Sequence, residues 1–146
     1  MTFDQLHEGI ENVCNCLENN GEVSENTSDT FARRVKNKPP ELSDFASYYQ
    51  EKQPCRKTDC KTVCQHRTVS ANKIDEHNEE VLKLKWLEFL RFKPKASKIF
   101  CKFKLKENAG LVWHTPNGKQ PCHYSILKSD EFTMEHLELI DVFELV

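Results

Sequence analysis

Residues 98–106 read KIFCKFKLK, so apolar and basic side chains alternate along this stretch with a period of two. Such alternation is typical of a β-strand with one buried face and one half-exposed face. Two turn sequences follow, ENAG at 107–110 and PNG at 116–118, and they separate two further predicted strands at 111–115 and 122–127. The sequence therefore predicts an antiparallel β-meander whose first strand has a lysine-rich outer face.

Upstream of this meander, apolar residues recur at steps of three and four, which predicts helices. We expect a helix at 3–18, a short helical turn at 31–35, and further helices at 41–52 and 71–91. The tail at 135–146 fits either a helix or an edge strand, and we favour a turn followed by a strand. The predicted fold class is therefore α+β, with N-terminal helices followed by a small antiparallel β-meander in a single compact domain.

The order of these elements also predicts how the chain is organised, since 146 residues are typical of one domain. Residues 1–21 are expected to form an acidic N-terminal helix, and residues 22–40 a polar linker that includes the short helical turn. Residues 41–146 are expected to form an α+β core, which contains a cysteine-rich loop at 55–66.

The formal net charge of -2 hides an uneven distribution of charge along the chain. Residues 1–32 contain seven acidic side chains and no Lys or Arg, and residues 107–146 have a net charge of -5. Between them, the net charge is +4 over 33–63, -2 over 64–80 and +8 over 81–106. Acidic ends thus flank a basic middle, which allows internal charge pairing, a basic patch for a polyanion, or acidic ends that mask such a patch.

Composition excludes several common classes of protein. The chain has only four glycines, which are too widely spaced for a G-x-G-x-x-G motif or a P-loop. The N-terminus shows no signal peptide, and no apolar run approaches the roughly 18 residues that a membrane helix needs. Seven cysteines are an odd number, and without an export signal they favour reduced thiols. We therefore expect a cytoplasmic protein with no membrane partner.

The densest group of candidate metal ligands is Cys55, Cys60, Cys64 and His66, in the pattern C-x4-C-x3-C-x-H. Three thiolates and one imidazole suit tetrahedral zinc, although zinc knuckles usually have C-x2-C spacing. A structural zinc ion at these four residues is therefore one hypothesis. The alternative is a loop with reduced, partly buried thiols, and a disulfide is the least favoured arrangement.

Two histidines lie on the strands of the predicted C-terminal hairpin, His114 on one and His123, next to Tyr124, on the other. If the connecting turn is short, the two imidazoles approach each other across the strand pair. They could then ligate a metal or exchange a proton with a substrate. The alternative, which we favour, is a cross-strand pair that supports the sheet or a partner-binding surface.

Two histidines are also followed by a hydroxyl residue two positions later, His66 by Thr68 and His123 by Ser125. Two-histidine phosphoesterases use such paired motifs, in which the histidines act as acid and base and the hydroxyls bind phosphate. Sixteen Ser and Thr residues in 146 positions produce such matches readily by chance. The phosphoesterase is therefore kept as an alternative function.

The basic segment at 83–106 interleaves lysines with aromatic residues, a combination that suits single-stranded nucleic acid. The lysines expected on the outer strand face are Lys98, Lys102, Lys104 and Lys106. The helical and strand periods place most aromatic rings of this segment on buried faces. A solvated lysine-rich face that protects the sheet from further pairing is the simpler alternative.

These observations favour a binding protein over an enzyme, because the sequence shows no complete catalytic constellation. We expect a small protein-binding module that acts as an accessory, inhibitory or regulatory subunit of a larger protein assembly. Its binding surface would combine the strand lysines with His114, His123 and Tyr124. One alternative is a phosphoesterase or nucleic-acid-processing enzyme that uses His66 and His123, and the other is a nucleic-acid-binding protein that uses the basic face at 83–106.

Overall fold

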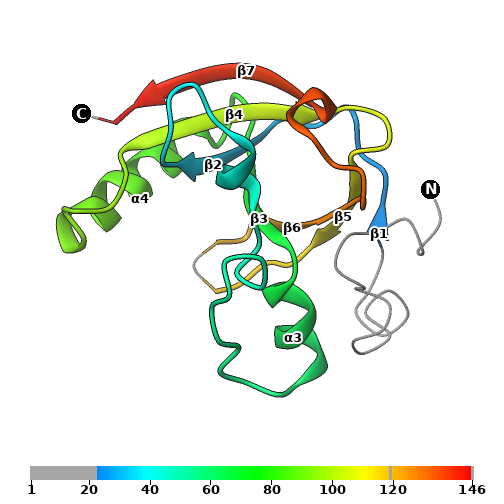
Figure 1. Ribbon diagram of the computed structural model, residues 1–146. Coiled ribbons are helices and arrows are strands. Elements are labelled where there is room, and N and C mark those ends of the chain that lie inside the picture. Colours follow the sequence, from blue (N-terminus) through cyan, green and yellow to red (C-terminus); the bar gives the residue numbers. More distant parts are fainter. Residues whose placement is uncertain (1–22, 119, 146) are drawn as a thin grey trace.

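The computed structural model describes residues 23–118 and 120–145, which form one antiparallel sheet with two α-helices and two 3-10 turns (Figure 1). The strands are β1 (Val23–Ser24), β2 (Phe31–Val35), β3 (Val69–Lys73), β4 (Ile99–Leu105), β5 (Gly110–His114), β6 (His123–Lys128) and β7 (Leu137–Glu144). The helices are α3 (Cys60–His66) and α4 (Glu79–Phe92), and the 3-10 turns are η3 (Leu42–Phe45) and η4 (Met134–His136). Neither of these α-helices is long and apolar enough to cross a membrane.

The order of strands across the sheet is β1-β5-β6-β3-β2-β4-β7, and this order corrects the predicted fold class. Strands β1, β2 and β3 come from the first half of the chain, and β2 and β3 lie between β6 and β4. The predicted meander is therefore split, because β5 pairs with β1 and β6 and not with β4. In the described part of the chain, helices alternate with strands instead of preceding them. The helix predicted at 3–18 lies outside the described residues.

Three further predicted elements differ from the observed ones. The segment 31–35 is a strand and not a helical turn, because Phe31 and Val35 share one face in either structure. The predicted helix at 41–52 is reduced to the turn η3, and the cysteine-rich loop contains α3. The predicted helix at 71–91 begins as β3 and becomes helical only at α4.

The period-two patterns predicted the second half of the chain better. Strands β4, β5 and β6 confirm the three predicted strands, and β7 confirms a turn followed by a strand in the tail. Strand β4 pairs with β2 on one side and with β7 on the other, so it is central to its half of the sheet.

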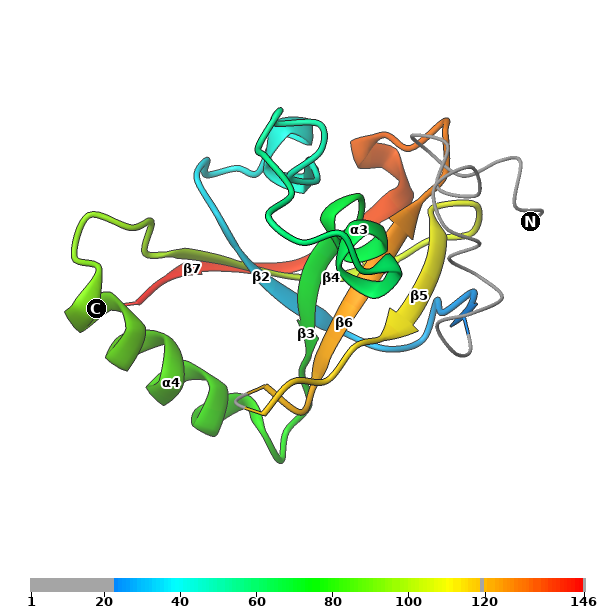
Figure 2. The same cartoon turned by 90° about the horizontal axis from the view of Figure 1, so that it is seen from below.

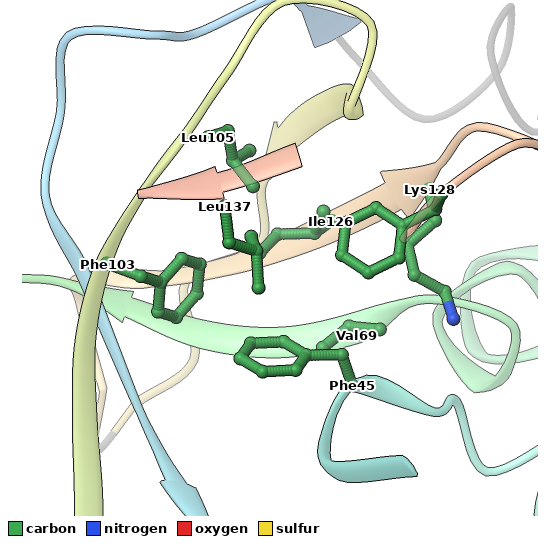
Figure 3. Close-up of a pocket in the computed structure, with 8 residues that line it drawn as sticks. Phe45, Val69, Phe103, Leu105, Ile126, Lys128 and Leu137 are labelled. Carbon is green, nitrogen blue, oxygen red and sulfur yellow. The ribbon is translucent and has the colours of Figure 1, made fainter. Parts of the chain in front are cut away.

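The main hydrophobic core lies on the inner face of the curled sheet and takes residues from β2 through β7. Phe45 of η3 closes this core, and its ring meets the ring of Phe103 edge-on with 5.3 Å between centroids. Figure 3 shows Phe45 and Val69 facing Phe103 and Leu137. The space among these side chains holds no water-sized volume, so it is a packed core and not a binding site.

Helix α4 packs on the outer face of the sheet (Figure 2). Leu82 and Trp86 cluster with Ala32 of β2, and Leu90 clusters with Phe100 of β4. Trp86 and Phe100 are stacked, with ring centroids 4.1 Å apart and planes inclined by 12°. Phe100 is therefore buried, whereas the alternation along 98–106 placed it on the half-exposed face. Both faces of β4 are covered at this point.

Candidate functional site

A groove of about 990 Å³ runs between α4 and the outer face of the sheet. Helix α4 forms one wall, and strands β2 and β3 with the start of β6 form the floor. The turn between β5 and β6 also borders it, and Figure 2 shows α4 lying alongside this side of the sheet. The volume is at the upper end of the range of roughly 300–1,000 Å³ that is typical of ligand sites.

The α4 wall is largely aromatic because its groove-facing residues recur at helical spacing. Lys85, Trp86, Phe89 and Phe92 line the groove, and steps of three and four place them on one side of the helix. Trp86 and Phe89 are half-buried, whereas Phe92 is 80% exposed. Tyr48 adds a ring that is 62% exposed. Large exposed rings gathered at a groove are typical of a binding surface.

One side of the groove adjoins a strongly basic surface. Residues 33–38 and 91–98 contain eight Lys and Arg and no acidic residue, and we call these two segments the basic edge. Pairing of Val35 with Ile99 brings the segments together, and the Ser97 hydroxyl donates a hydrogen bond to the Val35 carbonyl. Among the ion pairs in the described part of the chain, none involves the basic edge.

The two arginines of β2 have different surroundings. The Arg34 guanidinium lies over the Phe89 ring, 4.6 Å from its centroid, and the side chain is exposed. This cation–π contact positions the guanidinium at the groove, and no ion pair of Arg34 is found among residues 23–118 and 120–145. Arg33 is half-buried, donates from Nε to the Asp44 carbonyl at 3.0 Å, and has its pKa lowered by desolvation. Arg33 therefore holds η3 to the sheet, and Arg34 is the one available to a ligand.

The floor of the groove contains an amide without a partner. Asn72 of β3 pairs with His123 of β6, and the adjacent bond from Lys73 N to Cys122 O at 2.8 Å makes them a non-hydrogen-bonded pair. Side chains of such pairs lie closest together in an antiparallel sheet. Asn72 is only 8% exposed, yet its Oδ1 has no hydrogen-bond partner among the described residues. This oxygen is enclosed by its neighbours, so it is an unsatisfied acceptor of the interior and costs folding free energy.

His123 is held in one tautomer by Thr115. Its Nδ1 lies 3.0 Å from the Thr115 carbonyl oxygen and 2.8 Å from the Thr115 hydroxyl. Because a carbonyl only accepts, Nδ1 carries the hydrogen, and Nε2 is an acceptor in the neutral ring. Burial lowers the pKa of His123, which favours the neutral ring at physiological pH. Asn72 and His123 thus face each other across β3 and β6 at the floor of the groove.

The strand lysines predicted to form a binding face are only partly available. Lys102 Nζ donates to Glu79 Oε1, and this bond is the main cause of the lowered pKa of Glu79. Lys104 is half-buried in the pairing of β4 with β7. Lys98 and Lys106 are exposed, but they flank opposite ends of β4. Lys98 belongs instead to the basic edge.

The hairpin histidines do not share a face of the sheet. His114 pairs with Tyr124, and the two rings stack with 4.6 Å between their centroids. Because neighbouring residues of a strand alternate faces, His123 points to the other side. His114 Nε2 lies 2.9 Å from the Pro121 carbonyl oxygen, so His114 and Tyr124 brace the hairpin.

The four residues predicted to bind zinc are not assembled as a ligand set. Cys55 is exposed and its Sγ donates to the Lys57 carbonyl, while His66 Nε2 lies 2.8 Å from the Gln53 carbonyl oxygen. Cys64 is buried and disulfide-bonded, so the expectation of reduced thiols fails at this residue. Across the described part of the chain, no three Cys, His, Asp or Glu side chains are grouped to hold a metal ion. Zinc binding stays a prediction of the sequence.

The two halves of the proposed phosphoesterase pair are also separated. His123 pairs with a residue of β3 that lies three positions from Val69, a distance of roughly 10 Å along a strand. His66 lies beyond Val69, in α3. The hydroxyls of Thr68 and Ser125 are engaged in separate hydrogen bonds. The structure does not bring these four residues to one cleft.

Two residues of the groove, Arg34 and Asn72, were missed in the sequence as site residues, and Phe92 was noted only as one ring of the basic segment at 83–106. Their signals were a paired arginine in a basic run, an amide inside an apolar strand, and a ring at the end of an amphipathic helix. Together they supply a cation, a hydrogen-bonding floor and a stacking surface, which suits binding. Comparison of the chain with models of protein families, with curated proteins and with solved structures finds no match.

Proposed function

We propose that this chain binds single-stranded nucleic acid in the groove between α4 and the sheet. The observation that carries the proposal is the combination of an aromatic wall with the basic edge beside it. Proteins that bind single strands use a positively charged groove to follow the phosphates and aromatic rings to stack on the bases. Arg33 and Arg34 of the basic edge line the groove together with the aromatic residues of α4.

The aromatic residues are placed where bases could reach them. Phe92 and Tyr48 line the groove and leave more than half of their surface in water. A base stacked on an aromatic ring contributes about 1–3 kcal/mol to binding, so two such rings are enough for measurable affinity. In duplex DNA the base faces are stacked on one another, so the exposed rings favour a single strand.

The overall negative charge of the chain does not oppose this proposal, because the charges are segregated. The acidic residues concentrate in 1–32 and 107–146, whereas the basic edge carries eight positive charges and no negative one. Local potential, and not net charge, determines how a polyanion approaches a surface. Glu88 is the one carboxylate that lines the groove among the described residues.

The proposal is tested by truncating an exposed ring. In Phe92→Ala, affinity for a labelled twelve-nucleotide single strand should fall by about fivefold to a hundredfold, as expected from the loss of one stacked base. The measurement is fluorescence anisotropy at several salt concentrations, with ribo- and deoxyribo-oligonucleotides of the same sequence. Phe92 is 80% exposed, so its truncation leaves the core intact.

The matched control is Leu84→Ala, which removes a 65% exposed apolar side chain from the same helix but outside the groove lining. Its affinity should equal that of the unaltered chain. No binding of either oligonucleotide at low salt would overturn the proposal. Equal losses in the two variants would show that α4 contributes only through its general integrity.

A protein partner, as the sequence suggested, is the second candidate, and the edge strand β7 favours it. In the described sheet β7 pairs only with β4, and it exposes Leu139 and Ile140 at 42% and 45%. We propose that a strand of a partner protein could extend the sheet here through main-chain hydrogen bonds. A proline at Ile140 should weaken capture of such a partner, whereas oligonucleotide binding should not change.

A further inference from the structure

The edge of the sheet at β7 combines an open main chain with acidic side chains. We propose that β7 pairs with an extended segment of a partner protein in which lysine or arginine alternates with apolar residues. This inference rests on the second candidate function, the addition of a partner strand at β7, and it names the chemistry of that strand. Figure 1 shows β7 at the margin of the sheet, alongside β4.

The first observation is the direction of the main-chain groups of β7. Leu145 N donates to the Lys98 carbonyl at 2.9 Å, so these two residues form a hydrogen-bonded pair. Hydrogen-bonded and non-hydrogen-bonded pairs alternate along an antiparallel ladder. Counting back from Leu145, Val142 and Glu144 point their N–H and C=O groups away from β4. In the described sheet β7 pairs only with β4, so these groups form an open edge.

The other end of β7 is arranged in the same way. Lys106 N donates to the His136 carbonyl at 2.8 Å, and the same alternation points the main-chain groups of Leu139 away from β4. Ile140 lies at the register shift between the two halves and has no partner residue on β4. The side chains of Leu139 and Ile140 are 42% and 45% exposed, so apolar surface accompanies the open main chain.

The second observation is the charge on the face of β7 that carries α4. Glu138 and Asp141 lie opposite Lys104 and Lys102 of β4. Lys102 already donates to Glu79 of α4. Among residues 23–118 and 120–145, no ion pair involves β7, although this strand contains three acidic residues and no Lys or Arg. The edge therefore has a negative charge that a partner can neutralise.

Together these observations specify the pattern of the partner strand. A partner residue opposite Val142 shares its face of the sheet, where Val142 packs against the main core, so an apolar side chain suits that position. The exposed side chain of Leu139 favours the same choice. The next partner residue lies on the other face, beside Asp141 or Glu138, where an opposite charge stabilises a cross-strand pair. Apolar and basic residues should therefore alternate.

A second copy of β7 is the alternative occupant of this edge, and its charges disfavour it. Antiparallel pairing of two β7 strands would bring the acidic residues of one copy beside those of the other, and like charges across a strand pair are destabilising. Strand β7 also has no lysine and no proline, which often protect an edge from pairing. The edge is thus open to a strand of opposite charge.

The experiment uses three labelled seven-residue peptides, in which valine alternates with lysine, with threonine or with glutamate. Fluorescence anisotropy with the full chain at low salt should show that the lysine peptide binds about threefold to tenfold more tightly than the threonine peptide. The glutamate peptide should bind most weakly. N-methylation of the valine amides, which would face β7, should weaken the lysine peptide by about fivefold to a hundredfold. N-methylation of the lysine amides, on the solvent side, should have little effect.

The variant that tests the charge is Glu138→Gln with Asp141→Asn, which should bind the lysine and threonine peptides equally. Its matched control is Glu131→Gln with Glu135→Gln, which removes the same charge from the segment before β7 and should keep the preference for lysine.

The outcomes separate this inference from the strand addition on which it rests. Equal affinities of the unaltered chain for the lysine and threonine peptides would overturn the selection by charge and leave strand addition standing. Equal effects of the two N-methylations, or binding of no peptide, would overturn strand addition itself. A dimer in sedimentation that the lysine peptide dissociates would show that a second copy occupies the edge, and the inference would be wrong.

Discussion

Asn72 is a buried residue whose truncation should cost little stability. Its Oδ1 is buried without a donor, and such a group costs about 1–3 kcal/mol of folding free energy. In Asn72→Ala this cost disappears, which offsets the packing contacts that the buried amide loses. We expect the free energy of unfolding, measured by urea denaturation, to stay the same or rise by up to about 1 kcal/mol.

Ser125→Ala is the matched control for that prediction. The Ser125 hydroxyl lies 2.9 Å from the Thr115 hydroxyl in a buried position on the adjacent strand. Removing it should lower the free energy of unfolding by about 1 kcal/mol, the usual net value of such a bond. A comparable loss in Asn72→Ala would mean that its amide is satisfied in the free protein, and the idea of an unfilled acceptor would be wrong.

Single residues also show why the site was hard to find in the sequence. Phe92 continues the apolar spacing of α4, so its pattern predicts a core position, but the helix ends there and the ring remains in water. His123 was singled out correctly as a residue of interest. Its predicted neighbour, His114, faces the other side of the sheet. His114 pairs with Tyr124 and not with His123, and adjacent residues of a strand point to opposite faces.

At the scale of elements, local pattern was sufficient only where a strand has one clear period. Strand β4 alternates over seven residues, and the prediction of 98–106 matches its bounds to within one residue at each end. Strands β2 and β3 are five residues long, and β3 precedes a helical pattern. The strand period of two could therefore not be distinguished from the helical period in these segments. The insertion of β2 and β3 between β6 and β4 depends on pairing between distant segments, which no local window contains.

The attachment of α4 to the sheet provides a prediction at this scale. Glu79, in the first turn of α4, accepts a hydrogen bond from Lys102 of β4 and lies 3.3 Å from Lys83. The Lys102 bond is the main reason that the pKa of Glu79 is below its ordinary value of 4.5. Glu79→Gln should lower the free energy of unfolding at pH 7 by about 0.5–1 kcal/mol, as for a partly exposed ion pair.

The pH dependence of that difference follows from the direction of the shift. Because the folded pKa is lower than the unfolded one, the stabilisation is complete above pH 4.5 and is lost as the pH falls through the folded pKa. The gap between the two proteins should therefore close in acid. Glu80 is 83% exposed and, among the residues that the structure describes, forms an ion pair only with Lys83 at 3.9 Å, so Glu80→Gln should show almost no difference in stability at any pH.

At the scale of the whole molecule, strand pairing brings together basic segments that are distant in the sequence. The runs 33–38 and 91–98 are distant along the chain, and the pairing of β2 with β4 unites their charges beside the groove. The alternation along 98–106 predicted that the lysines of this strand form the basic binding surface. The fold instead pairs Lys102 with Glu79 and half-buries Lys104.

A binding surface on the basic edge and one on the lysines of β4 predict different effects of substitutions on the salt dependence of oligonucleotide affinity. Each phosphate contact on a single strand contributes about 0.7 to the slope of log affinity against log salt concentration. Lys93→Gln with Lys95→Gln, on the basic edge, should reduce that slope by up to about 1.4. Lys104→Gln with Lys106→Gln removes the same charge from the strand and should leave the slope unchanged. The opposite result would return the binding surface to β4, because the change in net charge is identical in the two double variants.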